Sequence, residues 1–339
     1  MKQKKIKYLL MQSGVMALFA GMMISCTEDL GEKVKTNPIT FTIDSDGLDE
    51  VSGTTRGTQV TSIINFGVSA SIYDKDAAGG YTSAGCGSYF YNQSATNGTP
   101  MNYFWPTTDY KVSFFAYYPY NGINTIDLPQ LSASNTIGLP IYTYTVPQTV
   151  TTQSDFMTAQ VTDCLCGPQG TVNLSFGHRC SDIKFLVDNQ KSDALTVNSI
   201  SIYGVKYSGT WTSGTSWSLS GSTNSPLSHP FTLTANINVS SATTADITST
   251  ANHFIMLPQT VSAGTDLFVI KTTENGDERT YTYTVPFGGI TWEMGKSYTY
   301  TIVLNDNDSG LSVSPVSVED WNTINSLTES FSVRDWVTP

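Results

Sequence analysis

The sequence predicts an all-β protein made of antiparallel β-sandwiches. Apolar and polar residues alternate with a period of two in many short segments rich in Thr, Tyr and Val, which is the pattern of strands buried on one face. Clusters of Gly, Asn, Asp and Ser separate these segments and are typical of turns. After residue 25, no segment has the 3.6-residue apolar period of an amphipathic helix. Many short strands with turn-rich connections favour sandwich folds.

The predicted strands are distributed along the chain in two groups. In order, they cover residues 39–43, 65–73, 111–120, 141–146, 171–176, 183–187, 199–205, 253–258, 266–272, 280–285 and 297–304. The polar segment 188–194 separates two strand-like runs, and the chain length suits two domains of roughly 100–200 residues each. We therefore predict an N-terminal sandwich over 38–190 and a C-terminal sandwich over 191–339.

The N-terminal segment has the pattern of a lipoprotein signal. Four lysines within residues 2–7 precede a short apolar run that ends at Ser25-Cys26. The run is too short for a stable membrane span, and Ser25 supplies the small residue that a signal peptidase needs. We predict that residues 1–25 are removed, that Cys26 is lipidated, and that polar residues 26–37 form a tether. The alternative is an ordinary signal peptide with an accidental cysteine.

The charge balance excludes one class of partner. The net charge is −11, and removing residues 1–25, which carry four lysines and no acidic residue, would lower it to −15. Such a surface repels phosphate backbones, so we expect no nucleic-acid partner.

The cysteines beyond Cys26 do not specify a disulfide framework. An exported protein permits disulfides among Cys86, Cys164, Cys166 and Cys180, but buried free thiols remain an alternative. If residues 156–166 and 171–180 form a hairpin, Cys180 faces Met157 rather than Cys164 or Cys166, which argues against a bridge within the hairpin.

No catalytic, cofactor or metal site stands out in the sequence. His178 and the cysteines near it lack the usual zinc-ligand spacing, so we interpret His178 as a core histidine bonded to a backbone group. Leu174, Phe176, His178 and Cys180 would share one face, and the apolar face then switches to Ile183, Phe185 and Val187, which predicts a bulge near 181–182. Fingerprints of hydrolases, metalloproteases, P-loops and dinucleotide sites are missing from the sequence. We therefore predict that the chain is not an enzyme and needs no cofactor.

Ordered motifs along the chain resemble those of the fimbrillin family of Bacteroidetes, the Mfa-like and FimA-like pilus subunits derived from lipoproteins. In chain order, the first matching motifs are Cys26, residues 39–43 followed by Thr54-Thr55-Arg56-Gly57, and residues 65–68. They continue with Trp105-Pro106, 114–120, 153–159, 174–178, 257–259, 292–302 and two copies of a Ser-Val-x-Asp-Trp motif at 317–321 and 332–336. The duplicated motif also has a simpler explanation, which is chance similarity between two strand-like segments.

The resemblance implies two transthyretin-like β-sandwich domains in tandem and display at the outer membrane. It further implies that a protease cuts after the first strand, with Arg56 and Gly57 at the matching position, and that a neighbouring subunit's strand fills the vacated groove. The donor in the family is a C-terminal segment, which corresponds to 311–339 here. Its candidate pocket-filling residues are Val313, Val316, Val318, Phe331, Val333 and Trp336.

Two functions follow as hypotheses. The first is a structural or tip subunit of a surface fimbria that binds other pilin subunits and supports adhesion to a host or bacterial ligand. The second is a glycan-binding surface lipoprotein, since the chain has 18 Tyr and 6 Trp that could stack on sugars. Trp105, Trp292, Trp321 and Trp336 follow strand-like or turn-like motifs, so we favour core and cross-strand packing for these side chains over display to a sugar. The C-terminal segment likewise could form the last strands of its own subunit, because a free strand edge promotes aggregation.

Overall fold

The described structure is almost entirely β-strand. The computed structural model describes residues 37–43, 63–75, 81–107, 110–122, 128–134, 140–164, 170–213, 216–248, 252–306, 312–314 and 316–321. Within these ranges the single helical element is a 3-10 turn, η1 (Val150–Thr152). The predicted all-β class is confirmed, whereas its division into two tandem transthyretin-like sandwiches stays a prediction.

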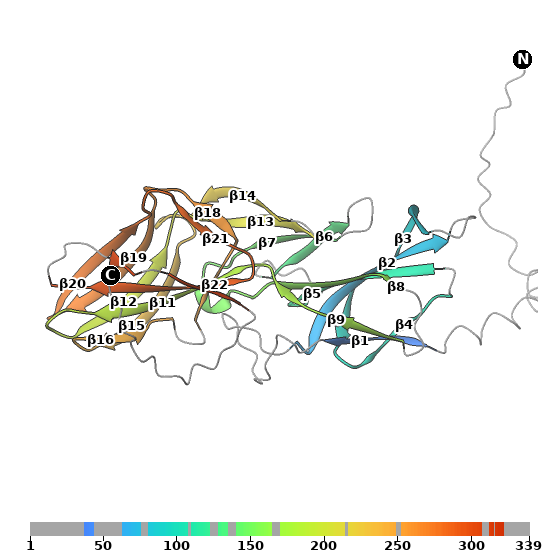
Figure 1. The fold of residues 1–339 in the computed structure, drawn as a ribbon, viewed down its shortest axis with the longest axis horizontal. Helices are drawn as coiled ribbons and strands as arrows, with labels where there is room; N and C mark the ends of the chain where they lie inside the picture. Colours follow the sequence, from blue (N-terminus) through green and yellow to red (C-terminus); the bar gives the residue numbers. More distant parts are fainter. Residues whose placement is uncertain are drawn as a thin grey trace, which may run out of the picture.

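Two sheets at one end of the molecule enclose the smaller of two hydrophobic clusters (Figure 1). A three-stranded sheet has the order β4 (Pro100–Phe104), β1 (Pro38–Ile43), β9 (Thr171–Leu174). A five-stranded sheet has the order β10 (Gly177–His178), β8 (Met157–Cys164), β5 (Tyr110–Tyr118), β2 (Asn65–Lys75), β3 (Tyr81–Thr96). The smaller cluster consists of Ile39, Phe41, Ile63, Phe66, Val68, Ala70, Phe90, Ala95, Trp105, Val112, Phe114, Ala116, Met157, Ala159, Val172, Leu174 and Phe176.

The remaining sheets surround the larger cluster. One has the order β16 (Thr243–Asp246), β11 (Ser181–Asn189), β22 (Lys296–Leu304), β23 (Ser312–Val313), with β17 (Phe254–Met256) on β11 and β24 (Ser317–Asp320) on β22. A second has the order β15 (Phe231–Val239), β12 (Leu195–Ile202), β19 (Asp266–Glu274), β20 (Asp277–Thr284). The others are β14 (Trp217–Thr223), β13 (Lys206–Thr212), β7 (Pro140–Thr145), β6 (Gln130–Ser134), and the pair β18 (Gln259–Val261), β21 (Ile290–Trp292).

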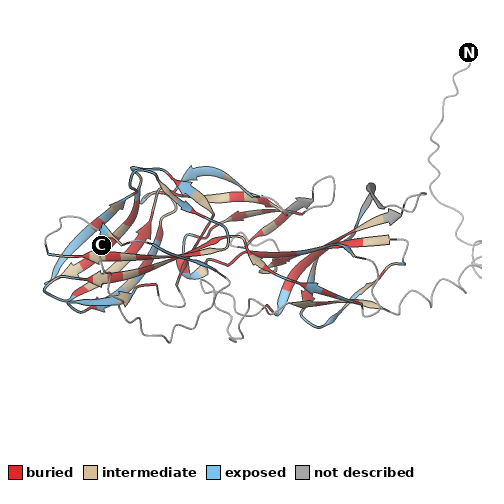
Figure 2. Ribbon diagram, in the orientation of Figure 1, coloured by how far each residue is buried: buried red, intermediate tan, exposed pale blue. Residues whose placement is uncertain are grey.

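Aromatic rings join the facing sheets of the larger cluster. The Phe185 ring of β11 lies 4.8 Å from Phe268 of β19 and 5.8 Å from Tyr300 of β22, measured between centroids. Buried residues follow the inner faces of the strands in both halves (Figure 2). The burial of such rings is the main favourable term in sandwich stability.

The two clusters do not divide the chain at a single position. Strand β7 lies before residue 190 but pairs with β13, with Tyr142 opposite Trp211 and Tyr144 opposite Gly209. Both tyrosines are buried in the larger cluster. The predicted boundary near 190 stays a prediction, with strands β6 and β7 contributing to the sheets beyond it.

The segment 171–180 departs from the predicted hairpin. Strand β9 pairs in parallel with β1, and within this segment only the short strand β10 pairs with β8, with His178 opposite Met157. The predicted register, with Cys180 opposite Met157, is therefore wrong, because the chain crosses from one sheet to the other between Leu174 and Gly177. The predicted switch of the buried face is confirmed by the burial of Leu174, Phe176, His178, Cys180, Ile183, Phe185 and Val187.

Two of the cysteines are described in full. Cys164 is partly exposed and Cys180 is buried, and both are free thiols. Burial raises the pKa of the Cys180 thiol far above its usual value, with a contribution from the charge of Asp155, so this thiol is unreactive. The side chain of Cys86 and all of Cys166 lie outside the described residues, and their redox state stays a prediction.

Gly67 allows the close approach of Tyr117 within the five-stranded sheet. A Cβ at Gly67 would lie 2.1 Å from Tyr117 Cε1, and the tyrosine hydroxyl is fixed by a 2.6 Å hydrogen bond to Asn92 Oδ1. We expect Gly67→Ala to lower the free energy of unfolding by about 1–3 kcal/mol, as overpacking does. Urea denaturation measures this loss. Gly87→Ala is the matched control, because its Cβ would meet only Ile72 Cγ2 at 3.9 Å. Equal stability of the two variants would contradict the expectation.

Candidate functional site

Strand β1 occupies the centre of the three-stranded sheet and is held on both sides. It pairs in parallel with β9, from Thr40 opposite Thr171 to Ile43 opposite Leu174, and antiparallel with β4. Gly170 and Gly98 extend these ladders, since Thr40 N donates to Gly170 O at 3.0 Å and Gly98 N donates to Phe41 O at 2.8 Å. A central strand with partners on both edges is costly to remove.

The inward side chains of β1 fill an aromatic pocket. Ile39 and Phe41 are completely buried. The Phe41 ring makes edge-to-face contacts with Phe66 and Phe114 at centroid distances of 5.9 and 5.2 Å. The β1 slot, which we define as the space between β4 and β9 that β1 occupies, is therefore an apolar groove with an aromatic floor.

The outward face of β1 contributes weaker polar contacts. The Thr42 hydroxyl donates to Asn173 Oδ1 at 3.3 Å, and Ile43 N donates to Asn97 Oδ1 at 3.2 Å. Without β1, strands β4 and β9 would stand roughly 10 Å apart, or two strand spacings, with unpaired backbone groups facing each other. Such a slot recognises any strand that supplies backbone hydrogen bonds and inward apolar side chains.

The predicted protease site lies in the connection between β1 and β2. Strand β1 ends at Ile43, and the next described strand begins at Asn65. Arg56 and Gly57 fall between them and, like Cys26, lie outside the described residues. Cutting the chain there would leave β1 attached to the rest of the subunit by non-covalent contacts alone.

The described part of the predicted donor segment pairs with its own subunit. Strand β23 pairs with β22 at Val313, which is half-buried against the larger cluster. Strand β24 pairs with β22 at Val318 opposite Tyr298. The side chains of Val316 and Val318 are 36% and 51% exposed. The other candidate residues, Phe331, Val333 and Trp336, lie outside the described residues, and the donor role of all six stays a prediction.

Trp321 fixes the chain at the point where β24 ends. Its ring stacks on His178 with a centroid distance of 4.3 Å and an interplanar angle of 9°, and its backbone N–H donates to Gly295 O at 2.9 Å. Both rings are buried. The C-terminal segment therefore starts from a fixed position between strands β10 and β22.

His178 is a core histidine, as predicted, but its predicted backbone partner is wrong. Its Nδ1 lies 2.8 Å from Asp155 Oδ2, and both side chains are buried. A buried carboxylate needs such a partner because an unpaired charge in the interior is costly. This pair was not predictable from the sequence, because 23 residues separate its members.

A second buried histidine pairs with a second aspartate. Asp182 is fully buried; its Oδ1 lies 3.0 Å from His253 Nδ1, and its Oδ2 accepts a hydrogen bond from Ser297 Oγ at 2.8 Å. Burial raises the pKa of Asp182, but the charge and hydrogen bond of His253, with Lys184 and Ser297, outweigh this effect and leave the pKa lowered. Among the described residues, neither histidine forms a hydrogen bond to a serine, threonine or cysteine side chain, which a hydrolase triad would place on the histidine.

The lowered pKa of Asp182 predicts a dependence of stability on pH. A depressed folded-state pKa contributes stability above the unfolded-state value, near 4, and this stability disappears as pH falls through the folded-state pKa. We therefore expect Asp182→Asn to lower the free energy of unfolding by about 1–3 kcal/mol at neutral pH. On acidification below about pH 4, the free energy of unfolding of this variant should fall less than that of the native chain. Urea denaturation at several pH values tests this, with the exposed Asp277→Asn as control. If the free energy of unfolding of the native chain, Asp182→Asn and Asp277→Asn changed with pH in parallel, the expectation would be contradicted.

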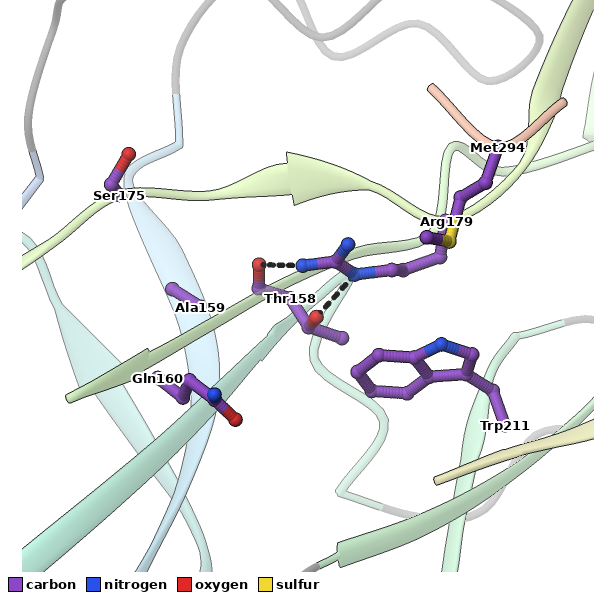
Figure 3. Close-up of a pocket in the computed structure, with 7 residues that line it drawn as sticks. All are labelled: Thr158, Ala159, Gln160, Ser175, Arg179, Trp211 and Met294. Atoms are coloured by element: carbon purple, nitrogen blue, oxygen red, sulfur yellow. Dashed lines mark hydrogen bonds between the residues drawn. The ribbon is translucent and has the colours of Figure 1, made fainter. Parts of the chain in front are cut away.

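A pocket of about 350 Å³ lies beside strand β8 (Figure 3). Its lining residues come from β8, from β13 and from the connections around β9, β10 and β22: Thr158, Ala159, Gln160, Ser175, Arg179, Trp211 and Met294. Arg179 Nε donates to Thr158 Oγ1 at 2.6 Å, and Nη2 donates to Thr158 O at 3.1 Å. The guanidinium lies 5.0 Å from the centre of the Trp211 ring. The contacts with Thr158 and Trp211 thus fix the position of the single cation among the described residues that line the pocket.

The described tryptophans are packed rather than displayed. Trp105, Trp211, Trp292 and Trp321 are buried and Trp217 is half-buried. The prediction of core packing is confirmed for Trp105, Trp292 and Trp321. Among the described residues, the large aromatic side chains that are strongly exposed are Tyr91 and Phe287.

Comparison with known proteins settles the family. The model of the fimbrillin-like family matches residues 54–321. The chain belongs to the fimbrillin-like family. This fimbrillin-like chain is also 33% identical to the fimbrium subunit Fim1C of Phocaeicola vulgatus over 201 residues, which cover 53% of the chain and 50% of that protein. It therefore spans about half the length of this relative.

A solved structure supports the fold of this fimbrillin-like chain. The crystal structure of a fimbrial protein from Bacteroides vulgatus is similar with a TM-score of 0.57 at 19% identity, over 84% of this chain and all of that one. In the described ranges, the chain has no helix long and apolar enough to cross a membrane.

Proposed function

We infer that this fimbrillin-like chain is a pilus subunit that joins its neighbours by exchanging β1 for a strand of another subunit. Membership of a fimbrial family supports the role of a pilus subunit. The position of β1 supports the mode of assembly. Its side chains fill a pocket at the centre of a sheet, yet its covalent link to the rest of the subunit is the connection that contains Arg56 and Gly57.

The exchange is favourable because the slot is costly to leave empty. Loss of β1 exposes the aromatic floor around Phe66 and Phe114 and leaves the ladder edges of β4 and β9 unpaired. An incoming strand restores both contributions, the backbone hydrogen bonds and the apolar burial. The segment 311–339 is the proposed donor.

Polymerisation of the full mature chain tests this function. Treatment with an arginine-specific protease is expected to cut after Arg56 and to produce SDS-resistant ladders, whereas Arg56→Ala is expected to remain monomeric. N-terminal sequencing of the polymer should begin at Gly57. A cut chain that stays monomeric with both β1 edges paired would rule out strand exchange.

Anchoring and adhesion complete the proposal. The N-terminal pattern supports a lipid on Cys26 that holds the subunit at the outer membrane before assembly, and mass spectrometry of the native N-terminus measures it. Adhesion to a host or bacterial ligand is the expected role of the assembled fimbria. The glycan-binding alternative has weak support, because the described tryptophans are buried or half-buried.

A further inference from the structure

The Arg179 pocket, which we define by the seven lining residues drawn in Figure 3, opens on the side of β8 that faces away from the smaller cluster. Thr158 and Gln160 line the pocket and alternate along β8 with Met157 and Ala159, which belong to that cluster. The inward side chains of β1 are buried in the same cluster. A ligand in the Arg179 pocket would therefore not compete with a strand in the β1 slot.

Arg179 is held so that one edge of its guanidinium group remains available. Trp217 Nε1 donates to Arg179 O at 2.5 Å, and the side-chain Nε and Nη2 donate to Thr158 Oγ1 and O. A guanidinium has five N–H donors in a fixed plane, so in the described structure one N–H on Nη2 and both on Nη1 have no protein partner. One N–H of each nitrogen lies along the same edge, and this geometry binds the two oxygens of a carboxylate.

The charge of Arg179 has no counter-charge among the described residues. No described carboxylate forms an ion pair with it. The chain has 28 Asp and Glu against 17 Lys and Arg, so carboxylates that could pair with a cation are abundant. Burial lowers the pKa of this guanidinium, because its charge has lost part of its hydration. An anionic ligand would supply the missing partner for this cation.

Neutral polar groups and apolar surface surround the cation. Ser213 Oγ donates to Gln160 Oε1 at 2.7 Å, which leaves the amide nitrogen of Gln160 to donate to a ligand. Ser175 is exposed and adds a hydroxyl. Met294 and Trp211 supply apolar surface on the other side of the guanidinium (Figure 3). Such a lining suits a small ligand that has a carboxylate, hydroxyl groups and a C–H face.

We propose that the Arg179 pocket binds the carboxylate of an acidic sugar of the uronic acid type. Arg179 binds the carboxylate through its available edge, and Gln160 and Ser175 bind ring hydroxyls. This inference rests on the adhesive role in the proposed function, for which it names the ligand class, and it does not depend on strand exchange. Recognition by a cation needs no exposed tryptophan, in contrast to the stacking of sugars on aromatic rings.

Charge and size favour a carboxylated sugar over other anions. A phosphate monoester carries a charge of about −1.5 to −2 at neutral pH, whereas the described lining supplies one positive charge, which a carboxylate matches. The volume of about 350 Å³ is near the lower limit of ligand sites, roughly 300–1,000 Å³, and suits one sugar ring better than a nucleotide. An acidic side chain of a peptide would bring the carboxylate but no ring hydroxyls for Gln160 and Ser175.

A matched pair of sugars tests the site on the uncut native chain. Methyl glucuronide and methyl glucoside differ in one group, which is a carboxylate in the first and a hydroxymethyl group in the second. We expect the glucuronide to bind about tenfold or more tightly than the glucoside, because it forms charge-assisted hydrogen bonds with Arg179. Isothermal titration calorimetry measures both affinities. Inorganic phosphate and N-acetylglutamate are the comparison anions, and both are expected to bind more weakly than the glucuronide.

Three variants locate the sugar in the pocket. Arg179→Gln is expected to bind the two sugars equally, and thermal unfolding shows whether it folds normally. Gln160→Glu preserves the fold, because Gln160 is exposed and a glutamate still accepts the hydrogen bond from Ser213. Its negative charge is expected to weaken glucuronide binding by about tenfold or more. Lys271→Gln is the matched control, since it removes an exposed charge from β19, which contributes no residue to the described lining, and it should bind both sugars as the native chain does.

Four results would overturn the proposed site. Equal binding of the two sugars by the native chain would remove the role of the carboxylate. Unchanged glucuronide binding in Gln160→Glu, or an equal loss in Lys271→Gln, would place the sugar elsewhere. Tighter binding of phosphate or N-acetylglutamate than of the glucuronide would assign the pocket to a different anion.

Retention of assembled fimbriae on a glucuronate-coated surface separates this inference from the proposed function. Retention of native fimbriae that is lost in Gln160→Glu would support both. If the uncut chain binds the glucuronide but the fimbriae are not retained, the adhesive role fails and the site stands. If native and Gln160→Glu fimbriae are retained equally, the adhesive role stands and the site fails.

Discussion

Replacing Phe41 with alanine is expected to lower the free energy of unfolding of the uncut chain by about 3–5 kcal/mol. The side chain is fully buried and touches rings from two strands of the facing sheet, so its removal leaves a cavity that rigid aromatic neighbours cannot fill. Urea denaturation measures the loss. After cleavage at Arg56, the same variant should release β1 faster, which mass spectrometry of the dissociated peptide measures.

Thr42→Ala is the matched control for Phe41→Ala. Its side chain lies on the outer face of β1, and it loses a single exposed hydrogen bond to Asn173. The expected cost is at most about 1 kcal/mol. A Phe41→Ala variant no less stable than Thr42→Ala would show that β1 does not anchor the smaller cluster.

Trp321→Ala is expected to destabilise the uncut chain by a similar amount, about 3–5 kcal/mol. The variant loses the stacking contact with His178 and a buried side chain that ranks among the largest in the described structure. Strand β24 should then detach from β22, since its own residues are exposed. Limited proteolysis should cut at residues 317–320 in this variant much faster than in the native chain.

Val318→Ala tests whether β24 itself contributes to this stability. Its side chain is half exposed, and the expected change is within about 0.5 kcal/mol. If Trp321→Ala is cut at residues 317–320 no faster than Val318→Ala, then the ladder with β22 holds β24 in place, and Trp321 does not.

The strands were predictable because their alternation reflects one-sided burial. Residues 39–43 illustrate this, since Ile39 and Phe41 face inward and the threonines between them do not. The partner of this strand was not predictable, because alternation does not encode which strand lies alongside. Strand β9, more than 120 residues away, pairs with β1 in parallel, whereas a local hairpin with β8 fits the sequence equally well.

The residues that pair across the fold were also hidden in the sequence. Asp155 and Arg179 lie in segments with ordinary strand patterns, and their roles depend on contacts with distant elements. One signal was available for Arg179. It stands between His178 and Cys180, in a segment whose neighbours are buried, where a charged residue needs a specific environment. The predicted pocket-filling residues, in contrast, came from the family resemblance.

The contact between His178 and Trp321 has a mechanical consequence. Strand β9 lies beside β1 (Figure 1) and leads within a few residues to His178, which stacks on Trp321 at the end of β24. In a fibre joined through these two segments, tension would enter and leave each subunit at nearly the same point. The larger cluster would then lie to one side of the line of force and would stay folded under tension.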